Sequence, residues 1–92
     1  MKGRALLAWN LRRLRAERGV SQERLAADAA VDRAYVSELE RKQANPTVDL
    51  LDKLAGVLGV SLAAFFQAPQ PGDKRPIKLK GGRPPKAKTR SR

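Results

Sequence analysis

The stretch SQERLAADAAVDRAYVSELERKQANP, residues 21–46, decides the fold of this chain. Its hydrophobic periodicity predicts two short helices, over about 22–29 and about 33–41, which are joined by a tight turn. Ser21 and Asp32 stand immediately before these helices, where a side-chain oxygen can accept a hydrogen bond from the first helical turn. The stretch therefore predicts a pair of helices with defined starting points.

The second of these helices has one apolar side and one polar side. Val36 and Leu39 fall on the side that would pack inward. Positions spaced i, i+3, i+4 and i+7 line the opposite side as one continuous surface. The outward residues are Arg33, Ala34, Ser37, Glu38 and Arg41. A rod of exposed polar side chains of this kind suits the major groove of DNA.

Three further helices are predicted around this pair. They cover about 4–18, 47–58 and 61–67, and each has apolar residues at helical spacing. No segment shows the alternation that predicts a strand. We therefore expect an all-α protein, a compact five-helix bundle that forms one domain over residues 1–68.

Positive charge is concentrated at the C-terminal end. The chain carries 20 lysines and arginines and 9 acidic residues, a formal net charge of +11. Nine of the basic residues but only one acid lie in residues 69–92, together with five of the six prolines. Such a segment cannot bury enough apolar surface to offset its ordering entropy. We expect a disordered basic tail over residues 69–92 and a polyanionic partner.

Composition also argues against several classes of function. The chain has no Cys and no His, the usual residues of metal sites and of nucleophilic catalysis. We therefore expect no enzyme, no metal, no cofactor and no domain for a small-molecule ligand. No apolar run approaches the roughly 20 residues that cross a bilayer, so we expect a cytoplasmic protein. A folded unit of about 65 residues is marginal alone, which favours a homodimer.

The chain resembles the Cro/repressor-type helix-turn-helix family, also called XRE-like. The resemblance covers about 7–66 and rests on LRRLRAERGVSQERLA (11–26), YVSELER (35–41) and NPTVDLLDKLAGVLGV (45–60). In that family the second helix lies across the DNA backbone and the third enters the major groove. The resemblance implies a bacterial, nucleoid-associated transcriptional regulator, repressor-like, that recognises an operator in double-stranded DNA.

The resemblance also implies roles for individual residues. An Arg can form two hydrogen bonds with guanine, a Glu can accept one from cytosine, and an Ala methyl can touch thymine. We expect base contacts from Arg33, Ala34, Ser37 and Glu38. We expect phosphate contacts from Gln22, Tyr35, Arg41, Lys42 and Asn45. A structural ion pair is expected between Arg15 and Glu40.

Two positions depart from the family's pattern, and one assignment has an alternative. Ala30 stands where the turn between the two helices often has Gly, and Lys42 stands where a Gly often ends the third helix. If the backbone at Ala30 is left-handed, its Cβ costs about 1–2 kcal/mol. Glu38 could instead pair with Arg33 or Arg41 and act mainly by rejecting wrong sequences.

The tail segment KGGRPPK, residues 80–86, resembles an AT-hook, a short motif that lies in the minor groove of A·T-rich DNA. The match is incomplete because Gly81 replaces the first arginine of the motif. The resemblance implies a minor-groove contact from Arg83, with Lys80 and Lys86 as neighbouring DNA contacts. The alternative is a cationic tail that follows phosphates without base preference.

Other functions stay open at this point. The same fold serves DNA-binding antitoxins, controllers of restriction–modification operons and adaptors that bind protein instead of DNA. An architectural or RNA-binding role through the tail is a further alternative.

Among the aromatic residues, Trp9 is expected in the core, with a dimer contact as its alternative. Of the adjacent Phe65 and Phe66, only one can face the core, which leaves the other for a dimer interface.

Overall fold

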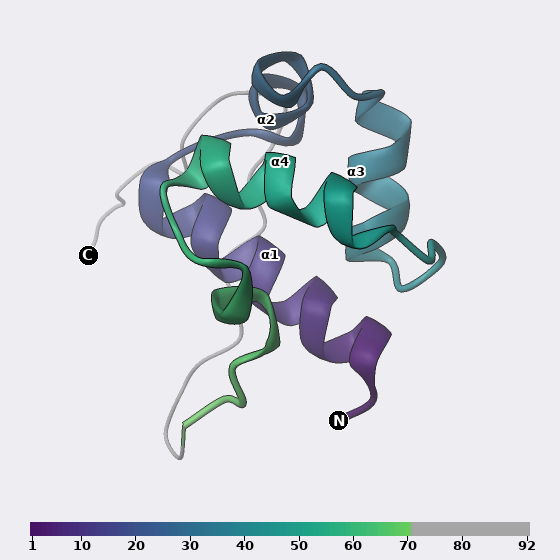
Figure 1. The fold of residues 1–92 in the computed structure, drawn as a ribbon, viewed down its shortest axis with the longest axis vertical. Coiled ribbons are helices and arrows are strands. Elements are labelled where there is room, and N and C mark those ends of the chain that lie inside the picture. The colour runs from purple at the N-terminus through teal and green to yellow at the C-terminus, as the bar shows by residue number, and fades with distance from the viewer. Residues whose placement is uncertain (71–92) are drawn as a thin grey trace, which may run out of the picture.

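The computed structural model describes residues 1–70, and within that range every regular element is a helix (Figure 1). Four α-helices follow one another along the chain, and a 3₁₀-helix ends the described fold. The elements are α1 (Gly3–Arg18), α2 (Gln22–Ala29), α3 (Arg33–Glu40), α4 (Val48–Leu58) and η1 (Leu62–Phe66). The expected all-α class is confirmed, and the fifth predicted helix is a 3₁₀-helix rather than an α-helix.

The predicted tail lies almost entirely outside the described residues. Only residues 69 and 70 of the segment 69–92 are described. The domain boundary after residue 68, the disorder of the tail and the DNA contacts of Arg83, Lys80 and Lys86 therefore stay predictions.

One hydrophobic core joins the four α-helices and η1. In Figure 1, α1 lies below α4, and α3 stands to one side of both. The helix α1 packs against α3 and η1. The helix α2 packs against α3 and α4. Every element places at least one fully buried side chain at the centre. These side chains include Leu11, Leu25, Val36, Leu54 and Phe65. The two helices of residues 21–46 thus depend on α1, α4 and η1 for their packing.

The aromatic residues follow the prediction at Phe65 and Phe66 but not at Trp9. Phe65 is fully buried and Phe66 is 43% exposed. The prediction that Trp9 lies in the core is wrong: its ring is half-buried at the surface, 5.6 Å from the guanidinium carbon of Arg13.

The buried position next to Trp9 is taken by Asn10. The amide nitrogen of Asn10 donates to the carbonyl oxygens of Phe65 and Gln67 at 2.9 Å each. Asn10 therefore anchors η1 to α1.

Ser21 and Asp32 both occupy the predicted N-cap positions, and Thr47, expected as the first residue of a helix, is the N-cap of α4. The Ser21 hydroxyl accepts from the backbone N–H of Arg24 at 2.9 Å, and the Thr47 hydroxyl accepts from that of Leu50 at 3.0 Å. Asp32 occupies the N-cap position of α3, but its carboxylate makes no capping hydrogen bond. Its contribution there is limited to its negative charge near the positive end of the helix dipole.

The turn between α2 and α3 is left-handed at Ala30, with φ 59° and ψ 44°. The backbone N–H of Ala30 donates to the carbonyl oxygen of Ala27 at 3.2 Å, and that of Val31 donates to Ala26 at 2.9 Å. These two bonds close the end of α2 as in a Schellman motif. In this conformation the Cβ of an L-residue crowds the backbone, so Ala30 stores strain that Gly would not.

Replacing Ala30 by Gly should therefore stabilise the protein. We expect Ala30→Gly to raise the free energy of unfolding by about 1 kcal/mol, because the Cβ clash is removed. Urea denaturation measures the change. Ala27→Gly, at an exposed position within α2, is the matched control and should lower the free energy of unfolding by about 1 kcal/mol. A destabilising effect of Ala30→Gly would contradict the strain at this turn.

Candidate nucleic-acid interface

The polar side of α3 faces away from the core. Arg33 and Ala34, in the first turn of the helix, are exposed. Ser37 and Glu38, one turn further on, are half-buried. The four residues that are expected to contact bases therefore share one accessible surface.

Glu38 has no ion-pair partner among the described residues. Neither Arg33 nor Arg41 lies within salt-bridge distance of its carboxylate in residues 1–70. The pairing of Glu38 with one of these arginines is thus not seen in this part of the chain. Within residues 1–70, the carboxylate of Glu38 and the guanidinium groups of Arg33 and Arg41 therefore have no salt-bridge partner.

Three of the expected phosphate contacts cluster at the end of α3. Arg41 follows the last residue of the helix, Lys42 and Asn45 lie in the loop to α4, and all three are exposed. Lys42 has a left-handed backbone, with φ 65°, which turns the chain from α3 into this loop. Tyr35 differs from them because it is only half exposed and packs against the core.

Gln22 makes a bond within the protein that no sequence pattern indicated. Its Nε2 donates to Oε1 of Glu40 at 3.0 Å. The two residues are 18 positions apart and lie on different helices, so the periodicity of one helix says nothing of this contact. A Gln amide has two N–H groups and a carbonyl oxygen, so one bond leaves further groups for a phosphate.

A buried ion pair holds α1 to α3. The side chains of Arg15 and Glu40 are only 1% and 3% exposed. The guanidinium donates from Nε to Oε2 at 2.5 Å and from Nη2 to Oε1 at 2.7 Å, which is the strong two-pronged geometry. Its Nη1 donates to the carbonyl oxygen of Val20 at 2.8 Å. The expected pair is therefore present, and with Gln22 it joins α1, α2, α3 and the segment before α2.

Arg12 is a further member of this network that the sequence analysis did not identify. Its Nη2 donates to the backbone carbonyl oxygen of Glu40 at 2.8 Å, and its Nε lies 3.7 Å from Oε1 of that residue. Glu40 is the last residue of α3, where carbonyl oxygens lack partners within the helix. Arg12 lies three positions before Arg15, so both side chains can reach the same helix end. That spacing is the signal that could have indicated Arg12.

The charge of this surface favours an anionic partner. Arg33, Arg41 and Lys42 are exposed, while Glu38 is the acid on the same side of α3.

In residues 1–70, no group of three or more His, Cys, Asp or Glu side chains could hold a metal ion. Across the same residues, no helix combines the length and the apolar character that crossing a membrane requires.

Removing one partner of the buried ion pair should strongly destabilise the fold, because the other charge stays buried without a counter-charge. We expect Glu40→Ala to lower the free energy of unfolding by about 3–5 kcal/mol, measured by urea denaturation followed by circular dichroism.

The matched control is Glu17→Ala, because Glu17 forms an ion pair with Arg13 at the surface and is 53% exposed. Surface pairs contribute about 0–1 kcal/mol, so this variant should unfold almost like the parent protein. Similar small losses in both variants would contradict the structural role of Glu40.

Comparison with known proteins relates this surface to a family. A sequence profile described as helix-turn-helix matches residues 11–65. A hypothetical transcription factor from Neisseria meningitidis is 43% identical over 67 residues, which are 73% of this chain but only 63% of that protein. The crystal structure of the hypothetical transcription factor NHTF from Neisseria has a TM-score of 0.73 and 41% identity, covering 76% of this chain and 80% of that one. The crystal structure of the restriction–modification controller protein C.AhdI from Aeromonas hydrophila has a TM-score of 0.67 and 36% identity. The match covers 68% of this chain and 96% of that one.

Proposed function

The chain belongs to the helix-turn-helix family HTH_3, and from this membership we propose that it is a repressor-like transcriptional regulator that binds a specific DNA operator. The observation that carries the proposal is the accessible polar surface of α3, which stands opposite the buried side of the same helix. The role is one of binding rather than catalysis and needs no cofactor. In a bacterium, such a regulator acts on the nucleoid in the cytoplasm.

In this proposal, the outward side of α3 contacts bases in the major groove. Arg33 is suited to guanine, Glu38 to cytosine, and the methyl group of Ala34 to the methyl group of thymine. Ser37 can serve as donor or acceptor for several bases. Their placement on one helix face supports this role, because a helix in the groove meets successive base pairs along one side.

Contacts with phosphates would fix the position of α3 on the duplex. Arg41, Lys42 and Asn45 would bind the DNA backbone at the C-terminal end of α3. Tyr35 would bind it from the first turn of α3, and Gln22 from the start of α2. The bond from Gln22 to Glu40 supports this assignment, because it holds the amide in place before DNA arrives. A side chain that is already ordered loses less conformational entropy on binding.

We also propose that the regulator binds DNA as a homodimer. Two copies would contact half-sites about 34 Å apart, one turn of the duplex, and the operator would be two-fold symmetric. The small size of the folded unit supports this, since so small a core leaves little surplus stability.

A controller of a restriction–modification operon is the second candidate. The likeness to C.AhdI favours it, because the match covers nearly the whole of that protein. Both candidates use the same kind of DNA contact, so the genes that lie beside the bound operator distinguish them.

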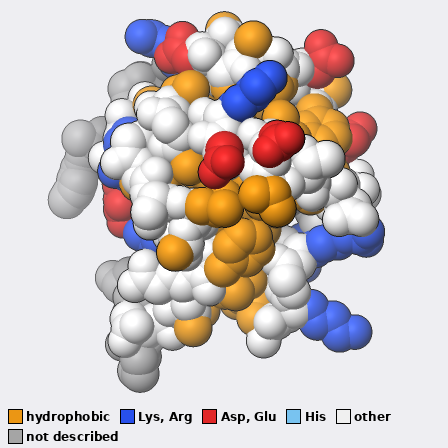
Figure 2. Space-filling model, in the orientation of Figure 1, with side chains coloured by type: hydrophobic (Ala, Val, Ile, Leu, Met, Phe, Trp, Pro, Cys, Tyr) orange, Lys and Arg blue, Asp and Glu red, His pale blue; other side chains and the backbone are white. Residues whose placement is uncertain are grey.

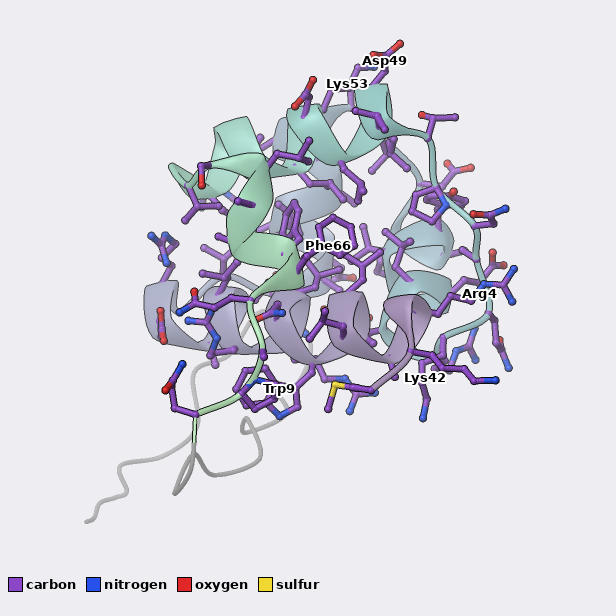
Figure 3. All side chains as sticks on the ribbon, turned by 60° about the horizontal axis from the view of Figure 1, so that its bottom comes forward. Arg4, Trp9, Lys42, Asp49, Lys53 and Phe66 are labelled. Atoms are coloured by element: carbon purple, nitrogen blue, oxygen red, sulfur yellow. The ribbon has the colours of Figure 1, made fainter. Side chains whose placement is uncertain are left out.

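Selection of bound sequences from a random pool of double-stranded DNA should return a two-fold symmetric consensus. Arg33→Ala should weaken binding to that consensus by about 1–3 kcal/mol and relax the preference at one position of each half-site. Fluorescence anisotropy with consensus and scrambled duplexes measures both effects. Lys53→Ala is the matched control, because Lys53 is an exposed cation on the outer side of α4 (Figure 3) and should leave discrimination unchanged.

Two results would contradict base contact by α3. Salt-insensitive binding of a protein partner, with little effect of Arg33→Ala, would favour an adaptor. A consensus with only a preference for A·T would shift the recognition to the C-terminal tail.

Deleting residues 69–92 should weaken DNA binding but leave its sequence preference intact. The segment holds nine basic residues, and none of them belongs to α3. If about five of them contact phosphates, the slope of log affinity against log salt concentration should become shallower by about 4.5. Titrations at several salt concentrations measure this slope. Complete loss of binding would instead favour an architectural or RNA-binding role through the tail.

A further inference from the structure

A pocket lies between the first half of α1 and the C-terminal end of α3. Its volume is about 410 Å³. Small-molecule sites in proteins typically measure about 300–1,000 Å³ and combine apolar walls with a few polar groups. This pocket has both kinds of wall. Its main apolar residues are Ala5, Ala8 and Trp9, and its cations are Arg12, Arg41 and Lys42.

The positive charge of the pocket is not neutralised within the described part of the chain. Neither Arg41 nor Lys42 forms an ion pair in residues 1–70. Arg12 has an acidic neighbour, because its Nε lies 3.7 Å from Oε1 of Glu40. That carboxylate is only 3% exposed and already accepts two hydrogen bonds from Arg15, so two arginines share one negative charge. The pocket therefore attracts anions.

Two views show this side of the molecule. In Figure 2, Lys and Arg side chains gather at the lower right edge, where the loop after α3 and the start of α1 lie in Figure 1. In Figure 3, Trp9 and Lys42 both lie on the side of α1 that faces away from α4. The aromatic ring and the cations are thus presented on one side of α1.

Trp9 supplies a flat aromatic wall with a fixed orientation. Its indole is half-buried, and the guanidinium carbon of Arg13 lies 5.6 Å from the ring centroid, which is an attractive contact. The Nη2 of Arg13 also donates to Oδ1 of Asn10 at 3.1 Å, which holds the guanidinium in place. Arg13 does not line the pocket, so the part of the indole that borders the pocket is open to a ligand.

We propose that this pocket binds a nucleoside diphosphate or triphosphate. The base stacks against Trp9, since every base has a flat ring that can pack on an aromatic side chain. The phosphates bind Arg12, Arg41 and Lys42, because charged hydrogen bonds from several cations suit a group with several negative charges. Stacking does not select one base, so the ligand is defined by a ring and a polyphosphate together.

The aromatic wall favours a free nucleotide over the DNA backbone as the source of the phosphate. The bases of a duplex are paired and stacked inside it, so a backbone phosphate that enters the pocket brings no base with it. A free nucleotide carries its ring and its phosphates on one ribose and can therefore contact both walls at once.

The nucleotide and the operator compete for the same cations. The proposed function assigns Arg41 and Lys42 to phosphates of DNA, and a nucleotide in the pocket occupies these groups. A rise in the nucleotide concentration then releases the operator. The inference rests on the proposed function only for this competition, because nucleotide binding itself is measured without DNA.

Calorimetric titration of the full chain with ADP, without DNA, tests the pocket. ADP should bind at least about tenfold more tightly than adenosine, which has the ring but no phosphate, and than pyrophosphate, which has no ring. Binding of ADP should also quench the fluorescence of Trp9, which is the only tryptophan of the chain.

Two variants separate the two walls of the pocket. Trp9→Leu keeps an apolar side chain but removes the aromatic face, so it should weaken ADP binding about tenfold and leave pyrophosphate binding unchanged. Lys42→Gln should weaken the binding of both. Lys53→Gln is the matched control, because Lys53 is an exposed cation of α4 that does not line the pocket, and it should change neither. Circular dichroism shows that the variants are folded.

Fluorescence anisotropy of a labelled operator duplex tests the competition. The ionic strength is held constant, because salt alone weakens DNA binding. ADP at ten times its own dissociation constant should lower the apparent affinity for the duplex about tenfold, as expected for two ligands that exclude each other. Adenosine at the same concentration should leave the affinity unchanged.

Three outcomes would overturn the nucleotide site. They are no binding of ADP, equal affinities for ADP and pyrophosphate, and a folded Trp9→Leu variant that binds ADP like the parent protein. Equal affinities would identify a site for phosphate alone, as the DNA backbone would supply it. An operator affinity that ADP does not change would overturn the competition. Specific operator binding by a chain that does not bind ADP would leave the proposed function standing and remove only this site.

Discussion

The burial of the Arg15–Glu40 pair is the constraint on which the arrangement of the helices depends. Moving two charges out of water costs several kcal/mol per ion, and the cost is offset only if every polar group finds a partner. Here the guanidinium donates to both carboxylate oxygens and to the carbonyl oxygen of Val20. The carboxylate also accepts from Gln22. These partners come from α1, α2, α3 and the segment between α1 and α2. The ion pair therefore holds the C-terminal end of α3 in place. The fixed position of α3 in turn determines which of its side chains face outward.

The helices and the outward side of α3 followed from the sequence because they obey local rules. The period of a helix and its end signals lie within a few residues, and α2 begins at Gln22 and ends at Ala29 as predicted. Contacts between helices do not obey such rules. The surface position of Trp9 and the bond from Gln22 to Glu40 depend on how α1, α2 and α3 are placed relative to one another. The ion pair was expected only through the resemblance to a family, and the missing cap bond at Asp32 depends on a side-chain rotamer that the residue type does not specify.

The division of α3 into an anchored side and a free side also bears on how such regulators acquire new targets. Arg33 and Ala34 are exposed, and neither belongs to the core or to the network around Glu40. Substitutions at positions of this kind change stability by only about 0.5 kcal/mol or less. In the base contact that we propose for this surface, a duplicated gene could gain a new operator by single codon changes here, while the core of its product stays the same.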